Sequence, residues 1–272
     1  MTKRPINGTE LFVETVGSGP PLLMLHGGLG LDHTSFRPYF DQLGDQATVV
    51  YYDHRGNGRS QRLANYETEL TFDNLVADAI GVLDDAGIGQ ATLLGHSYGG
   101  FVAQLVAIAH PDRLSGLVLV DTVPAFDYEP ALSGSDEQLA TFGQVLSGAA
   151  TDDESWKQMW ATIWPLYFHT YNPDDAARIH AGTHYNADAW NRSAALLGAF
   201  NTLEQLPAMH VPTLAVAGQH DFITPPEPGA TRLQALLPNA ELAIFAHSGH
   251  YPFMEEEPTF FARLRAFLDT LN

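Results

Sequence analysis

Short, almost continuous apolar runs recur along the chain, and a turn signal follows each one. Six such runs occupy residues 22–25, 48–52, 91–94, 117–120, 213–217 and 242–245. Runs of this kind, rather than strict alternation of polar and apolar positions, are typical of strands that are buried on both faces of a parallel sheet. The pattern therefore predicts a mostly parallel sheet that is covered on both sides.

Helical periods separate these runs. Residues 72–83 place five apolar side chains on one helical face and aspartates off it, and residues 98–109 are almost all small or apolar. Residues 260–271 close the chain as another amphipathic stretch, with Pro258 near its first turn, where proline is favourable. Strands that alternate with helices predict the α/β class, with a central sheet flanked by helices.

The stretch from residue 122 to residue 207 breaks this alternation. It has helical periods without a buried-strand pattern, and it contains all four tryptophans. We expect a helical lid at 122–207, inserted into a core formed by residues 1–121 and 208–272. A second independent domain is the less favoured alternative, because the stretch is short and its two ends must lie close together.

Composition excludes several classes of function. Thirteen basic against 32 acidic residues give a net charge of −19, which disfavours binding to nucleic acid or to an anionic membrane surface. The chain has no cysteine, so disulfides, thiolate catalysis and cysteine-ligated metals are excluded. The first residues are polar, and no apolar run approaches the roughly 20 residues that span a bilayer. The sequence thus predicts a cytoplasmic protein.

The strongest chemical motif is Gly95-His96-Ser97-Tyr98-Gly99, a G-x-S-x-G sequence between a predicted strand and a predicted helix. Glycines beside a serine on a sharp strand-to-helix turn let the backbone bend so that the serine stands clear. We interpret Ser97 as a nucleophile. A turn serine that merely caps the helix is the minor alternative.

A serine nucleophile needs a base, and the base needs a group that orients it. In this kind of sheet the acid and then the histidine follow the serine, each after a later strand. Asp221 and His250 occupy those positions, so the predicted triad is Ser97, His250 and Asp221. Asp121 as the acid and His247 as the base are weaker alternatives.

A tetrahedral intermediate also needs two backbone donors for its oxyanion. We expect one to be the N–H of Tyr98 and the other to be that of Gly28, with Leu29 as the fallback. A phosphate cradle in this glycine-rich loop is disfavoured, because no G-x-G-x-x-G or Gly-Lys-Ser/Thr pattern is present. No metal and no organic cofactor is predicted.

These motifs carry a family resemblance over essentially the whole chain. The segments 26–30, 52–60 and 95–100 resemble the α/β-hydrolase superfamily, lidded type, and are most similar to its proline iminopeptidase branch. The resemblance implies the α/β-hydrolase fold, with the lid inserted after the sixth strand. In that branch the first motif usually reads His-Gly-Gly-Pro-Gly, and Leu29 stands here in place of the proline.

The sequence departs from this branch where the substrate would bind. Relatives that cleave N-terminal residues resemble one another in holding the substrate ammonium with glutamates, whereas Phe222 follows Asp221 here. Glu137, Glu154 and Glu204 are lid carboxylates that nothing marks out, and a solvated helix face is the favoured interpretation of each. Leu29, Phe222 and the lid residues Trp160 and Trp164 are the predicted substrate-binding side chains, although a packing role for the tryptophan stripe is favoured.

The function that fits these features best is hydrolysis of carboxylic esters or lactones of small, largely apolar molecules. An aminopeptidase of the proline iminopeptidase kind is the first alternative. Carbon–carbon bond hydrolysis or perhydrolysis comes next, and a binding protein without turnover comes last. Aspartate replaces the serine in relatives that open epoxides or displace halides, so those reactions are disfavoured. The predicted partner is a small-molecule substrate, and the oligomeric state is left open.

Overall fold

The centre of the molecule is an eight-stranded sheet with the order β1-β2-β4-β3-β5-β6-β7-β8. The computed structural model describes residues 2–271. The strands are β1 (Thr2–Ile6), β2 (Thr9–Gly17), β3 (Pro21–Leu25), β4 (Thr48–Tyr52), β5 (Ala91–His96), β6 (Leu114–Val120), β7 (Thr213–Gly218) and β8 (Ala240–Phe245). Strands β3 to β8 pair in parallel, and β2 pairs antiparallel with both β1 and β4.

All six predicted strands are present, and the prediction of a mostly parallel sheet is confirmed. The β1–β2 hairpin at the edge of the sheet was not predicted. Its turn, Asn7-Gly8, has positive φ at both residues (46° and 77°), which suits a tight hairpin. Strand β2 mixes buried, half-buried and exposed positions, so it lacks the continuous apolar run that marks the inner strands.

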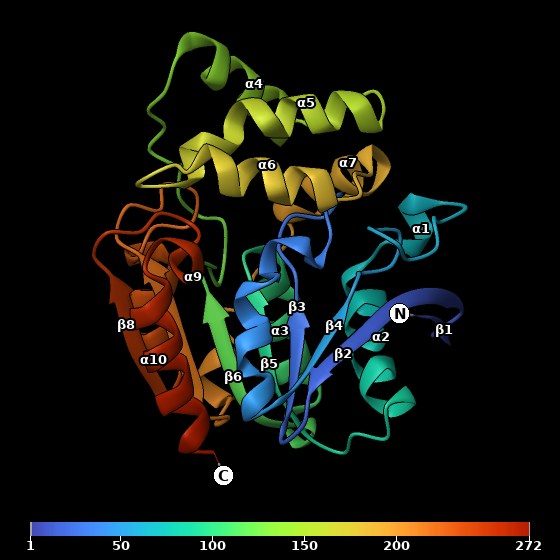
Figure 1. Cartoon of the computed structure of the whole chain (residues 1–272), viewed down its shortest axis with the longest axis vertical. Helices are drawn as coiled ribbons and strands as arrows, with labels where there is room; N and C mark the ends of the chain where they lie inside the picture. The colour runs from blue at the N-terminus through green and yellow to red at the C-terminus, as the bar shows by residue number, and fades with distance from the viewer. Residues whose placement is uncertain (1, 272) are drawn as a thin grey trace.

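Helices cover both faces of this sheet (Figure 1). One face carries α2, α3 and α8, and the other carries α10 together with the 3-10 turns of residues 33–45. The α-helices are α1 (Tyr66–Glu69), α2 (Phe72–Asp85), α3 (Tyr98–Ala109), α4 (Asp136–Leu146), α5 (Asp153–Ile163), α6 (Pro173–Gly182), α7 (Ala187–Leu197), α8 (Arg232–Leu236), α9 (Pro252–Glu255) and α10 (Glu257–Asp269).

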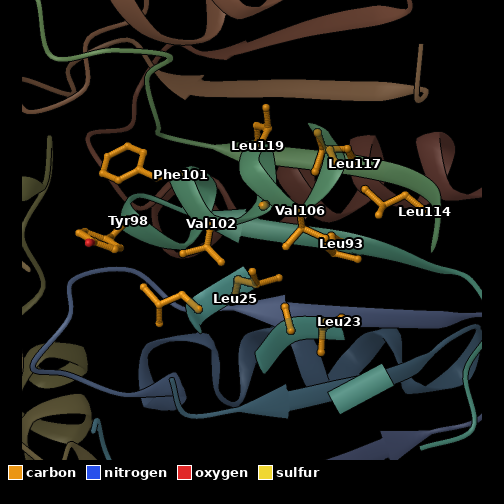
Figure 2. Close-up of a cluster of buried hydrophobic side chains, with 14 of the residues drawn as sticks. Leu23, Leu25, Leu93, Tyr98, Phe101, Val102, Val106, Leu114, Leu117 and Leu119 are labelled. Atoms are coloured by element: carbon orange, nitrogen blue, oxygen red, sulfur yellow. The ribbon is translucent and has the colours of Figure 1, made fainter. Parts of the chain in front are cut away.

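Helix α3 packs directly against the central strands through its buried apolar side chains. Figure 2 shows Phe101, Val102 and Val106 of this helix among leucines of β3, β5 and β6, such as Leu93. Phe101, Val102 and Val106 are at most 2% exposed, and each contributes roughly 1.5–3 kcal/mol through its burial. This packing fixes the N-terminus of α3 beside the carboxyl ends of the central strands.

Between β6 and β7 the structure has the four helices α4 to α7, which lie over the carboxyl ends of the strands (Figure 1). The indole N–H of Trp156 in α5 donates to the carbonyl of Gly30, 2.8 Å away, in the loop after β3. The indole of Trp190 in α7 ties that helix to Val145 in α4. Within residues 2–271, no helix is long and apolar enough to cross a membrane.

Candidate active site

Ser97 occupies the sharp turn between β5 and α3. Its φ and ψ are 54° and −120°, a conformation that a residue other than glycine rarely adopts. A Cβ atom at Gly95 would lie 2.5 Å from the Gly99 carbonyl oxygen, and one at Gly99 would lie 2.0 Å from the Leu25 carbonyl oxygen. Both glycines are therefore required for the close approach of strand and helix at this turn.

His250 and Asp221 meet behind the serine. The Nδ1–H of His250 donates to Asp221 Oδ2 over 2.7 Å, and both residues are buried. The other Asp221 oxygen accepts from the backbone N–H groups of Ile223 (2.9 Å) and Thr224 (3.1 Å), and the Thr224 hydroxyl donates to Oδ2 (2.6 Å). Burial alone would raise the pKa of Asp221, but His250 and these donors outweigh it and lower the pKa.

The backbone of His250 is also held from two sides. Its N–H donates to the carbonyl of Tyr167 in the lid (2.7 Å), and its own carbonyl accepts from His96 Nε2 (2.8 Å). Burial lowers the pKa of His96 to about 3, so this imidazole is neutral and has one N–H to donate. This hydrogen bond from His96 therefore helps to hold the loop that carries His250.

Ser97 and His250 line the same cavity, although among residues 2–271 no hydrogen bond joins the Ser97 hydroxyl to the His250 ring. Such contacts are often long before a substrate is bound and tighten in the complex. With its Nδ1–H donated to Asp221, the neutral ring has a free Nε2 that can accept a proton.

Neither of the two weaker alternatives takes part in the hydrogen bond between His250 and Asp221. His247 is exposed, and its backbone N–H donates to Glu256. Asp121 is fully buried next to the pair, but the carboxylate that accepts the His250 N–H belongs to Asp221. Oxygen or nitrogen atoms of Asp121, Asp221 and His250 lie within 4.8 Å of one another, the one group in residues 2–271 with metal-ligand spacing. The Asp221 oxygens already accept four hydrogen bonds, which fits a triad better than an ion.

The predicted oxyanion donors are placed on either side of the serine. Gly28 has a positive φ of 39°, and Tyr98 is the first residue of α3. Both residues line the cavity with Ser97. The N-terminus of α3 adds the positive end of the helix dipole at this point, which stabilises developing negative charge.

The cavity at Ser97 has a volume of about 70 Å³ and is mainly apolar. No aspartate, glutamate, lysine or arginine of residues 2–271 lines it. Its lining residues are Gly28, Leu31, His96, Ser97, Tyr98, Phe101, Phe126, Val145, Leu146, Trp160, Tyr167, Trp190, Leu197, Ile223, Thr224, His250 and Tyr251. Glu137 in α4, Glu154 in α5 and Glu204 in a turn are all exposed and lie outside the cavity lining.

Of the four predicted substrate-binding side chains, the structure brings only Trp160 to this cavity. Leu29 is fully buried in the hydrophobic cluster that packs α2 and α3 against the sheet. Trp164 begins a 3-10 turn after α5 ends. Its ring packs against His180 (ring centroids 4.5 Å apart) and stacks on Trp160 (6.2 Å), outside the cavity lining. Phe222 packs on Phe142 and Tyr167, 5.6 and 5.3 Å away.

Sequence reasoning missed several lining residues, among them Leu31, Phe126, Trp190 and Leu197. Leu31 lies two residues beyond Leu29 in the loop after β3, and its spacing from the glycines does not indicate contact with a substrate. The others are apolar residues of the lid and its approach. Their pattern indicates burial, but it does not say which buried cluster each residue joins.

Comparison with known proteins decides the family. A family model described as alpha/beta hydrolase fold matches residues 20–257. The chain belongs to this family. Both the fold prediction and the family resemblance are thereby confirmed.

The hydrolase has curated relatives of different activities. It is 28% identical to a proline iminopeptidase of Pestalotiopsis fici, over 97% of this chain and 98% of the relative. It is 27% identical to a pimeloyl-[acyl-carrier protein] methyl ester esterase of Pseudoalteromonas atlantica, over 93% and 95% of the two chains. Among solved structures, an enol-lactonase of Burkholderia xenovorans superposes with a TM-score of 0.82 at 22% identity, over 98% and 100% of the two chains, a likeness of fold.

Proposed function

We propose that this hydrolase cleaves carboxylic esters or lactones of small, uncharged, largely apolar molecules, with Ser97 as the nucleophile. The observation that carries the proposal is the composition of the cavity at Ser97, which has aromatic and aliphatic walls and, within residues 2–271, no aspartate, glutamate, lysine or arginine in its lining. A cavity of this kind favours an apolar acyl or alcohol group and leaves a charged substrate without a partner.

The proposed reaction is acyl transfer to water in two steps. Ser97 attacks the substrate carbonyl while His250 Nε2 takes the hydroxyl proton, and Asp221 stabilises the imidazolium through its 2.7 Å hydrogen bond to Nδ1. The N–H groups of Gly28 and Tyr98 hold the oxyanion, a contribution worth about 2.7–4 kcal/mol per donor in a well-studied protease. His250 returns the proton to the leaving alcohol, and water then releases the acid by the same route.

The size of the cavity adds an expectation about chain length. Its volume of about 70 Å³ is small beside the roughly 300–1,000 Å³ of pockets that bind drug-sized ligands. We therefore expect short acyl groups, such as acetyl and butyryl, to be hydrolysed faster than octanoyl.

A second candidate function is aminopeptidase activity, which the proline iminopeptidase relative favours. Its substrate carries a free ammonium, and burial of an unpaired ammonium is costly. None of the described residues that line the cavity offers a carboxylate to this ammonium, so this function ranks second.

The deciding experiment compares hydrolysis of p-nitrophenyl butyrate with that of proline p-nitroanilide. Wild type is measured beside Ser97→Ala and beside Ser133→Ala, which removes an exposed lid hydroxyl as a matched control. We expect ester turnover in wild type and S133A, its loss in S97A, and no anilide cleavage. Efficient anilide cleavage would reverse the ranking, and full ester activity in S97A would remove the serine mechanism.

A further inference from the structure

Asp121 is a buried carboxyl group that the proposed reaction does not use. It follows β6 with a positive φ of 46°, and it is 0% exposed. Oδ1 accepts the backbone N–H of Gly218 over 2.8 Å. Oδ2 is fully buried, and no N–H or O–H group of residues 2–271 donates to it. Asp221 and His250 lie beside it, with their polar atoms within 4.8 Å.

The two oxygens of Asp121 therefore have opposite surroundings. One accepts the N–H of Gly218, and the other has no donor. A carboxyl oxygen of Asp121 also lies within 4.8 Å of an oxygen of Asp221, which accepts hydrogen bonds and donates none. An ionised Asp121 would place an oxygen without a donor next to a second anion, in a site without water contact. A neutral carboxylic acid satisfies both sides, because its carbonyl oxygen accepts and its hydroxyl donates.

We propose that Asp121 is a positioning residue for the triad, held as a neutral acid whose hydroxyl donates to the carboxylate of Asp221. The two carboxyls then share a single negative charge. Only the expected effect of Asp121 on turnover rests on the proposed function, because the protonation state of Asp121 is a property of the fold.

The electrostatic surroundings agree with this geometry. Burial, followed by the charge of Asp221, raises the pKa of Asp121 well above its ordinary value. The groups that face the pair are His250, whose charge lowers the pKa of Asp221, and Glu255, whose charge raises that of Asp121. His96 contacts His250 as a neutral ring. Two carboxyls whose pKa values are driven apart are suited to different roles.

The hydroxyl of Asp121 also affects the catalytic base. A hydrogen bond donated to Asp221 withdraws negative charge from it, so Asp221 stabilises the imidazolium of His250 less strongly. His250 is then a free base at lower pH than it would be beside a carboxylate without this donor. No proton leaves Asp121 during turnover. The transferred proton passes only between Ser97, His250 and the leaving group.

The kinetic test is the pH dependence of kcat/KM for p-nitrophenyl butyrate in wild type, Asp121→Asn and Asp121→Leu. The asparagine amide keeps both an acceptor for Gly218 and a donor for Asp221, so it should retain the wild-type acidic limb. Leucine keeps the branching at Cγ, although it is larger, and it has no donor, so it should move that limb up by about one pH unit, the size of one ordinary hydrogen bond. An unchanged limb in D121L, or a loss in D121N as large as in Asp221→Asn, would overturn the proposal.

A second measurement does not depend on activity or on D121L folding. The protein is labelled with ¹³C at the aspartate carboxyls, and its NMR spectrum is recorded at pH 7 for wild type and D121N. We expect one carboxyl resonance at the position of a protonated acid in wild type and its absence in D121N. A wild-type spectrum in which every aspartate is ionised would refute the neutral acid, whereas absent ester turnover with this resonance present would count against the proposed function alone.

Discussion

Replacing His33 with glutamine should change how stability depends on pH. His33 begins the turn after the loop that carries Gly28, and its side chain is 2% exposed. Nδ1 lies 2.6 Å from an Asp53 oxygen and Nε2 lies 3.1 Å from a Glu14 oxygen. With a carboxylate at each nitrogen, the ring is held as an imidazolium that donates on both sides.

The magnitude follows from the pKa of this ring. Burial would lower it, but the hydrogen bonds to Asp53 and Glu14 outweigh burial and raise the pKa of His33 from 6.5 to about 9. The difference of about 2.5 corresponds to about 3 kcal/mol at 1.36 kcal/mol per pKa unit. Because the folded pKa is the higher one, this stabilisation is complete below pH 6.5 and is lost as the pH rises through 9.

Urea unfolding, followed by tryptophan fluorescence at pH 6 and at pH 10, measures this effect. The free energy of unfolding of His33→Gln is compared with that of wild type at each pH, so that other titrating groups cancel. We expect the difference between the two proteins to be about 3 kcal/mol smaller at pH 10 than at pH 6. His210→Gln, which changes an exposed histidine, is the control.

Equal destabilisation by His33→Gln at both pH values would refute a charged His33 in the folded protein. That result would mean that His33 is neutral in the folded state and contributes through packing alone. A pH-dependent difference of the same size in H210Q would instead show that the effect is general to the surface.

Three further changes test the site and its supports. Gly99→Ala puts a Cβ 2.0 Å from the Leu25 carbonyl oxygen, so α3 must move and ester kcat should fall by about 100-fold or more, as when an oxyanion donor is lost. Asp78→Ala leaves Arg55 buried without its partner and should lower the free energy of urea unfolding by about 3–5 kcal/mol. Glu255→Ala removes the acceptor of two 2.7 Å hydrogen bonds, from Thr170 in the lid and Gly249 beside His250, and should lower that free energy by about 1–3 kcal/mol.

The inner part of the fold was predictable from sequence because its strands are buried on both faces. Residues 117–120 are all apolar, which suits a strand that is covered on both faces, and the structure places them in β6. The edge hairpin was not predictable by the same rule, since β2 mixes buried, half-buried and exposed positions and its polar positions resemble a loop. The ends of α3 were predicted at the residues observed, because the strained turn at Ser97 fixes its start.

The lid shows what hydrophobic periodicity cannot predict. Trp156, Trp160 and Trp164 share one helical spacing, but α5 stops at Ile163 and only Trp160 reaches the cavity. Hydrophobic periodicity reports that a side chain is buried, and it does not report against which surface. The placement of each lid residue depends on how four short helices pack over the sheet, which is a property of contacts between distant segments.

The charges of the two aspartates that follow β6 and β7 could not be predicted from the sequence either. Asp121 and Asp221 each follow a buried strand, and spacing alone cannot decide which one is charged. In the structure His250 and Thr224 donate to Asp221, as does the N–H of Ile223, whereas Asp121 receives a single N–H, from Gly218. A buried carboxylate is stable only where donors surround it. Those donors come from loops that meet after the sheet has formed, so the charge of each carboxyl is determined by the fold rather than by its place in the sequence.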